Sequence, residues 1–126
     1  MCDMEKRSLS NIVGAKGEEI AAKWYKKKGF RVLQQNYRTP LGEIDLIVEK
    51  RGRWLVFVEV KTRTGTPLAR PCEAVDARKQ RKLIAAAQQY LCDIPQTEEN
   101  SRFDVMEIWL DEKGHPTISC IENAFW

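Results

Sequence analysis

The sequence predicts an α/β domain with a mixed β-sheet. Two segments carry apolar residues at helical spacing, and five shorter ones are rich in β-branched and aromatic residues. They follow the order helix, three strands, helix, two strands, and neighbouring strands are close enough in sequence to form antiparallel hairpins. With 126 residues, 43% of them hydrophobic, we expect a single domain over residues 1–126, with residues 1–9 flexible.

The first helix is expected over residues 10–28, where Val13, Ile20 and Trp24 share one side and Gly29 suits the C-terminus. The second is expected over residues 73–92, an Ala-rich segment with its apolar residues on one side.

The expected strands cover residues 30–37, 43–49, 54–63, 102–110 and 117–122. The segments TPLG, KRGR and DEKG form the turns between them. The segment TGTPLARPC should leave the sheet as a loop, either a plain connector or a functional loop beside charged strand ends.

Charge is distributed unevenly along the chain. Residues 1–92 hold 19 Lys and Arg against 10 Asp and Glu, whereas residues 93–126 hold two against eight. This asymmetry is typical of a positive face for an anionic partner such as nucleic acid, although a solvated surface explains it equally well.

Histidine use excludes several mechanisms. Because His115 is the single histidine, the chain lacks the residues that multi-histidine metal sites and most triad hydrolases require. Catalysis would depend on carboxylates and lysine. The chain has no apolar run of roughly 20 residues and no signal peptide at its start, so we expect a cytoplasmic protein without membrane contact.

Charged residues stand inside apolar strands. Glu59 and Lys61 share one face of their strand with Leu55 and Phe57, and Asp45 lies in the strand before. Buried charges need partners, so these residues either pair with each other or hold a ligand.

Strand register decides whether the two acids meet. An odd-numbered loop centred on Gly52 places Asp45 across from Glu59, whereas a two-residue loop sends them to opposite faces. We predict the first register, because it stacks Ile44, Leu46 and Val48 with Val56, Val58 and Val60 on one core face.

Two carboxylates this close repel unless a proton, a cation or a lysine intervenes. Mg²⁺ takes oxygen ligands and can activate water for phosphodiester hydrolysis, with Lys61 positioning that water or offsetting phosphate charge. The alternative is a structural ion pair of Lys61 with Asp45 or Glu59.

The motifs resemble a known arrangement. Asp45 followed by Glu59-Val60-Lys61 on the next strand, after a helix bearing Glu18, resembles the PD-(D/E)XK nuclease superfamily with its restriction-endonuclease-like αβββαβ core. The segments GEEIAAKWYKKKGF, GEIDLI, FVEVKTR, RFD and ENAF are similar to the YraN-like family of bacterial predicted endonucleases, related by fold to Holliday junction resolvases. The match covers about residues 14–125.

The resemblance implies roles for individual residues. Asp45 and Glu59 would bind Mg²⁺ or Mn²⁺, Lys61 would be the catalytic lysine, and Glu18 would be a further acid that orders metal-bound water. Glu18 is otherwise an ordinary helix-surface acid like its neighbour Glu19.

The family's expected substrate is DNA, possibly branched or damaged. The resemblance implies phosphate contacts for Arg38 and Arg63, and the basic turns of the second helix suit a phosphate-tracking surface. These helix residues are Arg78, Lys79, Arg81 and Lys82. Exposed solvated cations are the alternative.

Three further expectations accompany this hypothesis. Arg102 and Asp104 should form a structural ion pair, and Phe125 with Trp126 should plug the core. A homodimer is plausible for so small a domain, as is an unidentified protein partner. The alternative function is a nucleic-acid-binding or adaptor module that keeps the fold but does not cleave.

Overall fold

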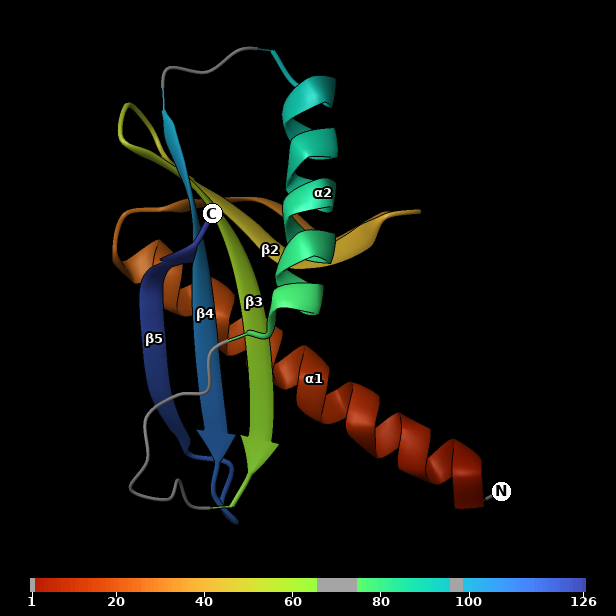
Figure 1. The fold of residues 1–126 in the computed structure, drawn as a ribbon. Coiled ribbons are helices and arrows are strands. Elements are labelled where there is room, and N and C mark those ends of the chain that lie inside the picture. The colour runs from red at the N-terminus through yellow and green to blue at the C-terminus, as the bar shows by residue number, and fades with distance from the viewer. Residues whose placement is uncertain (1, 66–74, 96–98) are drawn as a thin grey trace.

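A computed structural model describes residues 2–65, 75–95 and 99–126 of the chain (Figure 1). Its elements are α1 (Cys2–Lys27), β1 (Arg31–Thr39), β2 (Gly42–Lys50), β3 (Trp54–Thr64), α2 (Ala77–Asp93), β4 (Asn100–Leu110) and β5 (Pro116–Phe125). The predicted order of helices and strands is confirmed. In the described ranges, neither helix is long and apolar enough to span a bilayer.

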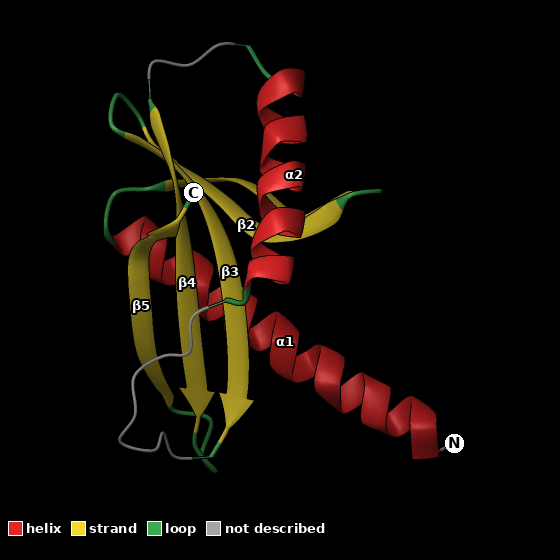
Figure 2. Ribbon diagram, in the orientation of Figure 1, coloured by secondary structure: helices red, strands yellow, loops and turns green. Residues whose placement is uncertain are grey.

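The five strands form one mixed sheet in the order β1-β2-β3-β4-β5. β3 and β4 are parallel, with α2 between them in sequence, and all other neighbours are antiparallel. The helices cover opposite faces of the sheet (Figure 2). This is an α/β fold consistent with the restriction-endonuclease-like core, as the sequence predicts.

Each face of the sheet has its own apolar core. On the α1 face, Ala21 and Tyr25 pack with Leu46, Val58 and Met106. On the α2 face, Leu83 and Ala87 pack against other buried residues, among them Leu55, Phe57, Phe103 and Val105. A sheet buried on both faces explains why its central strand β3 is apolar on both sides.

The helix bounds differ from the expected ones. α1 begins at Cys2 rather than near residue 10. α2 begins at Ala77, because the Asp76 side chain caps it by accepting a hydrogen bond from the Lys79 backbone amide at 2.9 Å. Residues 73 and 74, expected at the start of this helix, lie outside the described residues.

Gly17 lets α1 approach β3 closely. A Cβ atom at this position would lie 1.8 Å from Thr62 Oγ1, so only glycine fits there. Glu18 is the next residue of α1, so the close contact at Gly17 also holds the Glu18 backbone near β3.

The predicted register of β2 and β3 is confirmed. The strands pair from Lys50 with Trp54 to Leu46 with Val58, around a loop centred on Gly52. Beyond Leu46, β2 pairs only with β1, whereas β3 continues alongside β4 as far as Thr64. The β1–β2 hairpin therefore diverges from the rest of the sheet at Asp45, as Figure 1 shows.

The predicted core face is wrong at Ile44. Leu46 and Val48 pack on the α1 face as expected, but Ile44 packs with Ile47 on the α2 face. Regular alternation along β2 is broken at Asp45, where the strand leaves β3.

The ion pair expected of Arg102 and Asp104 is present and buried. Arg102 Nε donates to Asp104 Oδ1 at 3.0 Å, and the Tyr25 hydroxyl donates to Asp104 Oδ2 at 2.7 Å. At the chain end, the Phe125 ring stacks on Phe103 with centroids 4.6 Å apart. Trp126, expected to plug the core with it, contacts Phe103 edge-on at 4.9 Å but is 51% exposed. Both pairs tie the C-terminal strands to the core.

Candidate active site

Two carboxyl groups meet where β2 leaves β3. The Asp45 and Glu59 side chains are hydrogen-bonded to each other, and the Val60 backbone amide donates to Asp45 Oδ2 at 2.8 Å. The Glu59 side chain is only 13% exposed. The fold thus holds two acids in one poorly hydrated position, as the register predicts.

Both carboxyl groups hold protons more tightly than usual. The pKa of Glu59 is raised to about 7, mainly by burial and then by the nearby Asp45 carboxylate, while Lys79 acts in the opposite direction. Burial also raises the pKa of Asp45, while the Val60 amide lowers it. Near neutral pH, the pair therefore shares a proton that a cation could replace.

The cation beside the acids comes from α2. Lys79 Nζ lies 3.6 Å from Glu59 Oε1, in the first turn of the helix. The sequence suggested Lys79 as a phosphate contact and Lys61 as the possible ion-pair partner. The structure brings Lys79 to the acid pair, so one of the predicted DNA-contacting residues belongs to the site itself.

Lys61 lies two residues beyond Glu59 on the same face of β3. Its register partner on β4 is Glu107, a buried acid that the sequence analysis did not select. Glu107 also accepts a hydrogen bond from Trp109 Nε1 at 2.7 Å and lies 3.4 Å from Arg63 Nε. An acid inside the apolar segment VMEIWL was the signal that could have identified it.

Glu18 approaches Asp45 from α1, the opposite side of the sheet. Asn36 Nδ2 donates to Glu18 Oε2 at 3.2 Å. Burial raises the pKa of Glu18, Asn36 lowers it, and the Asp45 charge raises it. The charge of Glu18 therefore interacts with that of Asp45, although Glu18 comes from the α1 face of the sheet.

Asn36 is a second residue that the sequence analysis did not select. Its φ of 52° is left-handed, a conformation that asparagine tolerates better than most residues. In the β1–β2 register it falls between the pairs Gln35 with Leu46 and Tyr37 with Ile44, directly opposite Asp45. Asn36 thus lies opposite Asp45 and also hydrogen-bonds Glu18.

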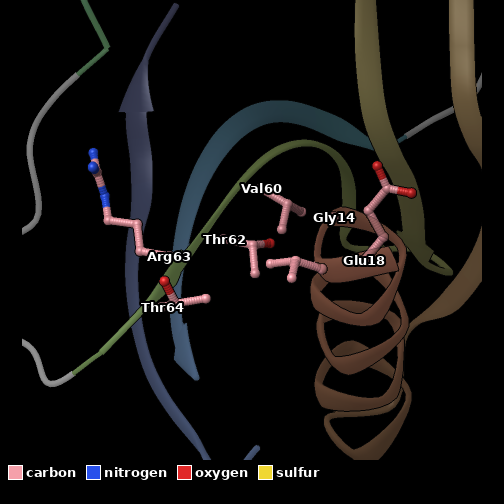
Figure 3. Close-up of a pocket in the computed structure, with 7 residues that line it drawn as sticks. Gly14, Glu18, Val60, Thr62, Arg63 and Thr64 are labelled. Carbon is pink, nitrogen blue, oxygen red and sulfur yellow. The ribbon is translucent and has the colours of Figure 1, made fainter. Parts of the chain in front are cut away.

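A cavity of about 490 Å³ lies between α1 and the end of β3. Figure 3 shows Glu18 on its helical side, with Val60 and Thr62 across from it, and Arg63 pointing away from Glu18. Glu18 therefore lines a cavity on the α1 side of β3.

The acids do not form a complete metal-binding cluster. Within the part of the chain that the structure describes, no three His, Cys, Asp or Glu side chains are grouped as ion ligands. The structure brings Asp45 and Glu59 together and leaves Glu18 outside that pair. Mg²⁺ commonly uses one or two protein carboxylates with waters and substrate oxygens, so two acids are a sufficient donor set.

The other residues predicted to contact DNA lie on β1 and α2. Arg38 is exposed with its Nε 3.8 Å from Glu43, while Lys79 and Lys82 line a cavity beside the β1–β2 turn. Arg78 and Arg81 are exposed on α2. Gly42 packs against the Lys82 carbonyl, where a Cβ atom would lie 2.5 Å from the oxygen, so the hairpin is held close to this helix.

Comparison with known proteins gives the family without an activity. The model of the uncharacterised protein family UPF0102 matches residues 17–108. The UPF0102 protein of Alkaliphilus oremlandii is 46% identical over 119 residues, which cover 93% of this chain and 100% of the relative. A UPF0102 protein of Caldanaerobacter subterraneus is 42% identical, covering 95% and 99%, and one of Rhodococcus jostii is 40% identical, covering 90% and 95%.

Proposed function

The chain belongs to the uncharacterised protein family UPF0102, and we propose that it is a metal-dependent endonuclease that hydrolyses phosphodiester bonds in DNA. The observation that carries this proposal is the partly buried, hydrogen-bonded pair of Asp45 and Glu59 where β2 leaves β3, followed by Lys61 on the same strand as Glu59. The order of these residues supports a place in the PD-(D/E)XK superfamily.

The donor set suits a hard divalent cation. Asp45 and Glu59 present carboxylate oxygens, which Mg²⁺ and Mn²⁺ prefer over nitrogen or sulfur ligands. Without such an ion, a shared proton and the Lys79 ammonium offset the negative charge. A bound ion would supply Lewis-acid stabilisation of the phosphate and a more acidic water.

The protein's own residues would divide the remaining work. Lys61, on the same face as Glu59, would hold a phosphate oxygen or the attacking water through its ammonium group. Glu18, which lines the cavity on the α1 side, would order water there. Asn36 would hold the Glu18 carboxylate in place through its hydrogen bond.

DNA is the proposed substrate because Lys79 lies beside the acid pair and further cations lie on the same helix or near the acids in sequence. Lys79, Lys82, Arg78 and Arg81 come from α2, while Arg38 and Arg63 flank the acids in sequence. Such residues bind backbone phosphates without reading sequence, which suits branched or damaged DNA. We further propose a cytoplasmic location, and a homodimer or an additional protein partner for a domain with so small a surface.

A non-cleaving DNA-binding module is the second candidate. The ion pair of Lys79 with Glu59 and the hydrogen bond from the Val60 amide to Asp45 favour it, because they stabilise the acids without a metal. Under this function the same residues would support the fold of a DNA-binding surface.

Cleavage of labelled linear, flapped and four-way DNA with Mg²⁺ or Mn²⁺ separates these candidates. Wild type should cut, and Asp45→Asn, Glu59→Gln and Lys61→Ala should each be slower by at least about 100-fold. Glu19→Gln is the matched control, because Glu19 is an exposed acid on α1 that pairs with Lys23. DNA binding by wild type without any cleavage would favour the binding module instead.

A further inference from the structure

Two basic segments that are distant in sequence meet at the end of the sheet away from the acid pair. Residues 26–31 run from the last turn of α1 to the start of β1, and residues 50–53 comprise the end of β2 and the β2–β3 turn. Lys50 Nζ donates to the Lys28 carbonyl at 3.2 Å, which joins the two segments. We call the four cations Lys28, Lys50, Arg53 and Arg102 at this junction the distal basic patch.

The distal basic patch surrounds a cavity of about 360 Å³. Phe30, Trp54 and the acid Glu122 complete the lining. Four cations stand against two acids, Glu122 in the lining and Asp104 bonded to Arg102, so the cavity has a net positive charge that favours an anion.

Aromatic rings and a buried acid contact three of these cations, Lys28, Lys50 and Arg102. The Arg102 guanidinium lies 4.9 Å from the Trp54 ring centroid and bonds to Asp104, which is fully buried. Lys28 Nζ lies 4.4 Å over the Trp24 ring, and Lys50 Nζ lies 5.5 Å from the Phe30 ring. Fixed cations lose little side-chain entropy on binding, which favours anion capture over simple solvation.

The distal basic patch is separate from the acid pair. Trp54 precedes Glu59 by five residues on β3, a separation of about 17 Å along an extended strand. Trp54 packs on the α1 face, whereas Glu59 pairs with Lys79 of α2 on the other face. One straight stretch of DNA lying over the acids would therefore not reach the patch.

We propose that the distal basic patch binds backbone phosphates of a second DNA segment, so that the preferred substrate is DNA that branches or bends around the domain. This inference rests on the proposed action on DNA and adds the shape of the substrate. Lys28, Lys50 and Arg53 contact the phosphates, while Arg102, already bonded to Asp104, supplies positive charge at the floor.

Fluorescence anisotropy of labelled DNA, without divalent metal and over a range of salt, tests the inference. The variant Lys28→Ala/Lys50→Ala/Arg53→Ala is compared with Lys16→Ala/Lys23→Ala/Lys113→Ala, which removes the same charge from exposed positions outside the patch. Circular dichroism checks that both variants are folded.

The patch variant should bind four-way DNA about tenfold or more weakly, and its log–log salt slope should be shallower by about 2–3. The control variant should change affinity about twofold at most, since it removes no phosphate contact. A short linear duplex, which lies over the face of the acid pair and not over the opposite face with the patch, should bind both variants alike.

If both variants weaken the binding of four-way DNA equally, the inference is overturned, because loss of positive charge anywhere on the protein would explain the result. A mononucleotide that binds wild type but not the patch variant, while four-way DNA binds both alike, would also overturn it, by assigning the patch to a free phosphorylated ligand. If wild type cleaves DNA while the variants bind alike, this inference fails and the proposed function stands. If wild type neither binds nor cleaves any DNA, both fail.

Discussion

The Val60 backbone amide donates a hydrogen bond to Asp45 Oδ2 at 2.8 Å, across the point where β2 and β3 stop pairing. An acid side chain thus takes the place of a strand carbonyl in the ladder. The same side chain therefore both supports the open sheet and forms half of the proposed metal site.

This double role predicts different effects for two Asp45 variants. Asp45→Asn keeps an oxygen for the Val60 amide, whereas Asp45→Ala leaves that amide without its partner. Urea unfolding should show Asp45→Ala to be less stable than Asp45→Asn by about 1–3 kcal/mol, and neither variant should cleave DNA. Equal stability would show that the hydrogen bond does not support the fold.

Stability should depend on pH through the acid pair. The pKa of Glu59 is raised from 4.5 to about 7, so the folded protein binds a proton more tightly than the unfolded chain does. The free energy of unfolding from this group should therefore be greatest below the unfolded pKa and fall as pH rises through about 7. Thermal melts across this range should show the decline, and Glu59→Gln should flatten it; an unchanged profile would contradict the shared proton.

Lys79 should compete with a divalent ion. Its ammonium lies 3.6 Å from Glu59, where it offsets the charge that would attract the metal. Lys79→Met should therefore bind Mn²⁺ more tightly by about three- to tenfold in calorimetry, although the metal-free protein should be less stable. Lys82→Met, one turn further along α2, is the control and should leave Mn²⁺ affinity unchanged. Weaker Mn²⁺ binding by Lys79→Met would contradict competition.

Two glycines of α1 should respond oppositely to alanine. A Cβ atom at Gly17 would collide with the Thr62 side chain, whereas nothing lies within 4 Å of one at Gly14. Gly17→Ala should lower the free energy of unfolding by about 1–3 kcal/mol, and Gly14→Ala should raise it by about 0.5–1 kcal/mol because alanine favours the helix. Denaturant unfolding that gives both variants the same sign would contradict the close contact of α1 with β3.

Local patterns predicted most of the fold. Gly52 between two apolar strands predicted the turn and register, and period-two alternation in β3 predicted that Glu59 and Lys61 share a face. Both signals act over a few residues, so the sequence carries them directly.

The features that the sequence did not predict depend on long-range contacts. Ile44 changes face because β2 leaves β3 at Asp45, opposite the left-handed Asn36. Lys79 resembled any other helix cation until the packing of α2 brought it to Glu59, 20 positions away in sequence. Neither propensity nor spacing reports how a helix docks on a sheet.

The proposal that the acid pair binds a catalytic metal is tested most directly by one rate comparison. It is the single-turnover cleavage rate of labelled four-way DNA over a Mg²⁺ titration, for wild type and Glu59→Gln. Wild type should cleave in a Mg²⁺-dependent manner, and Glu59→Gln should be slower by at least about 100-fold while still folding and binding the DNA. Equal rates, or cleavage by wild type that needs no divalent ion, would contradict it.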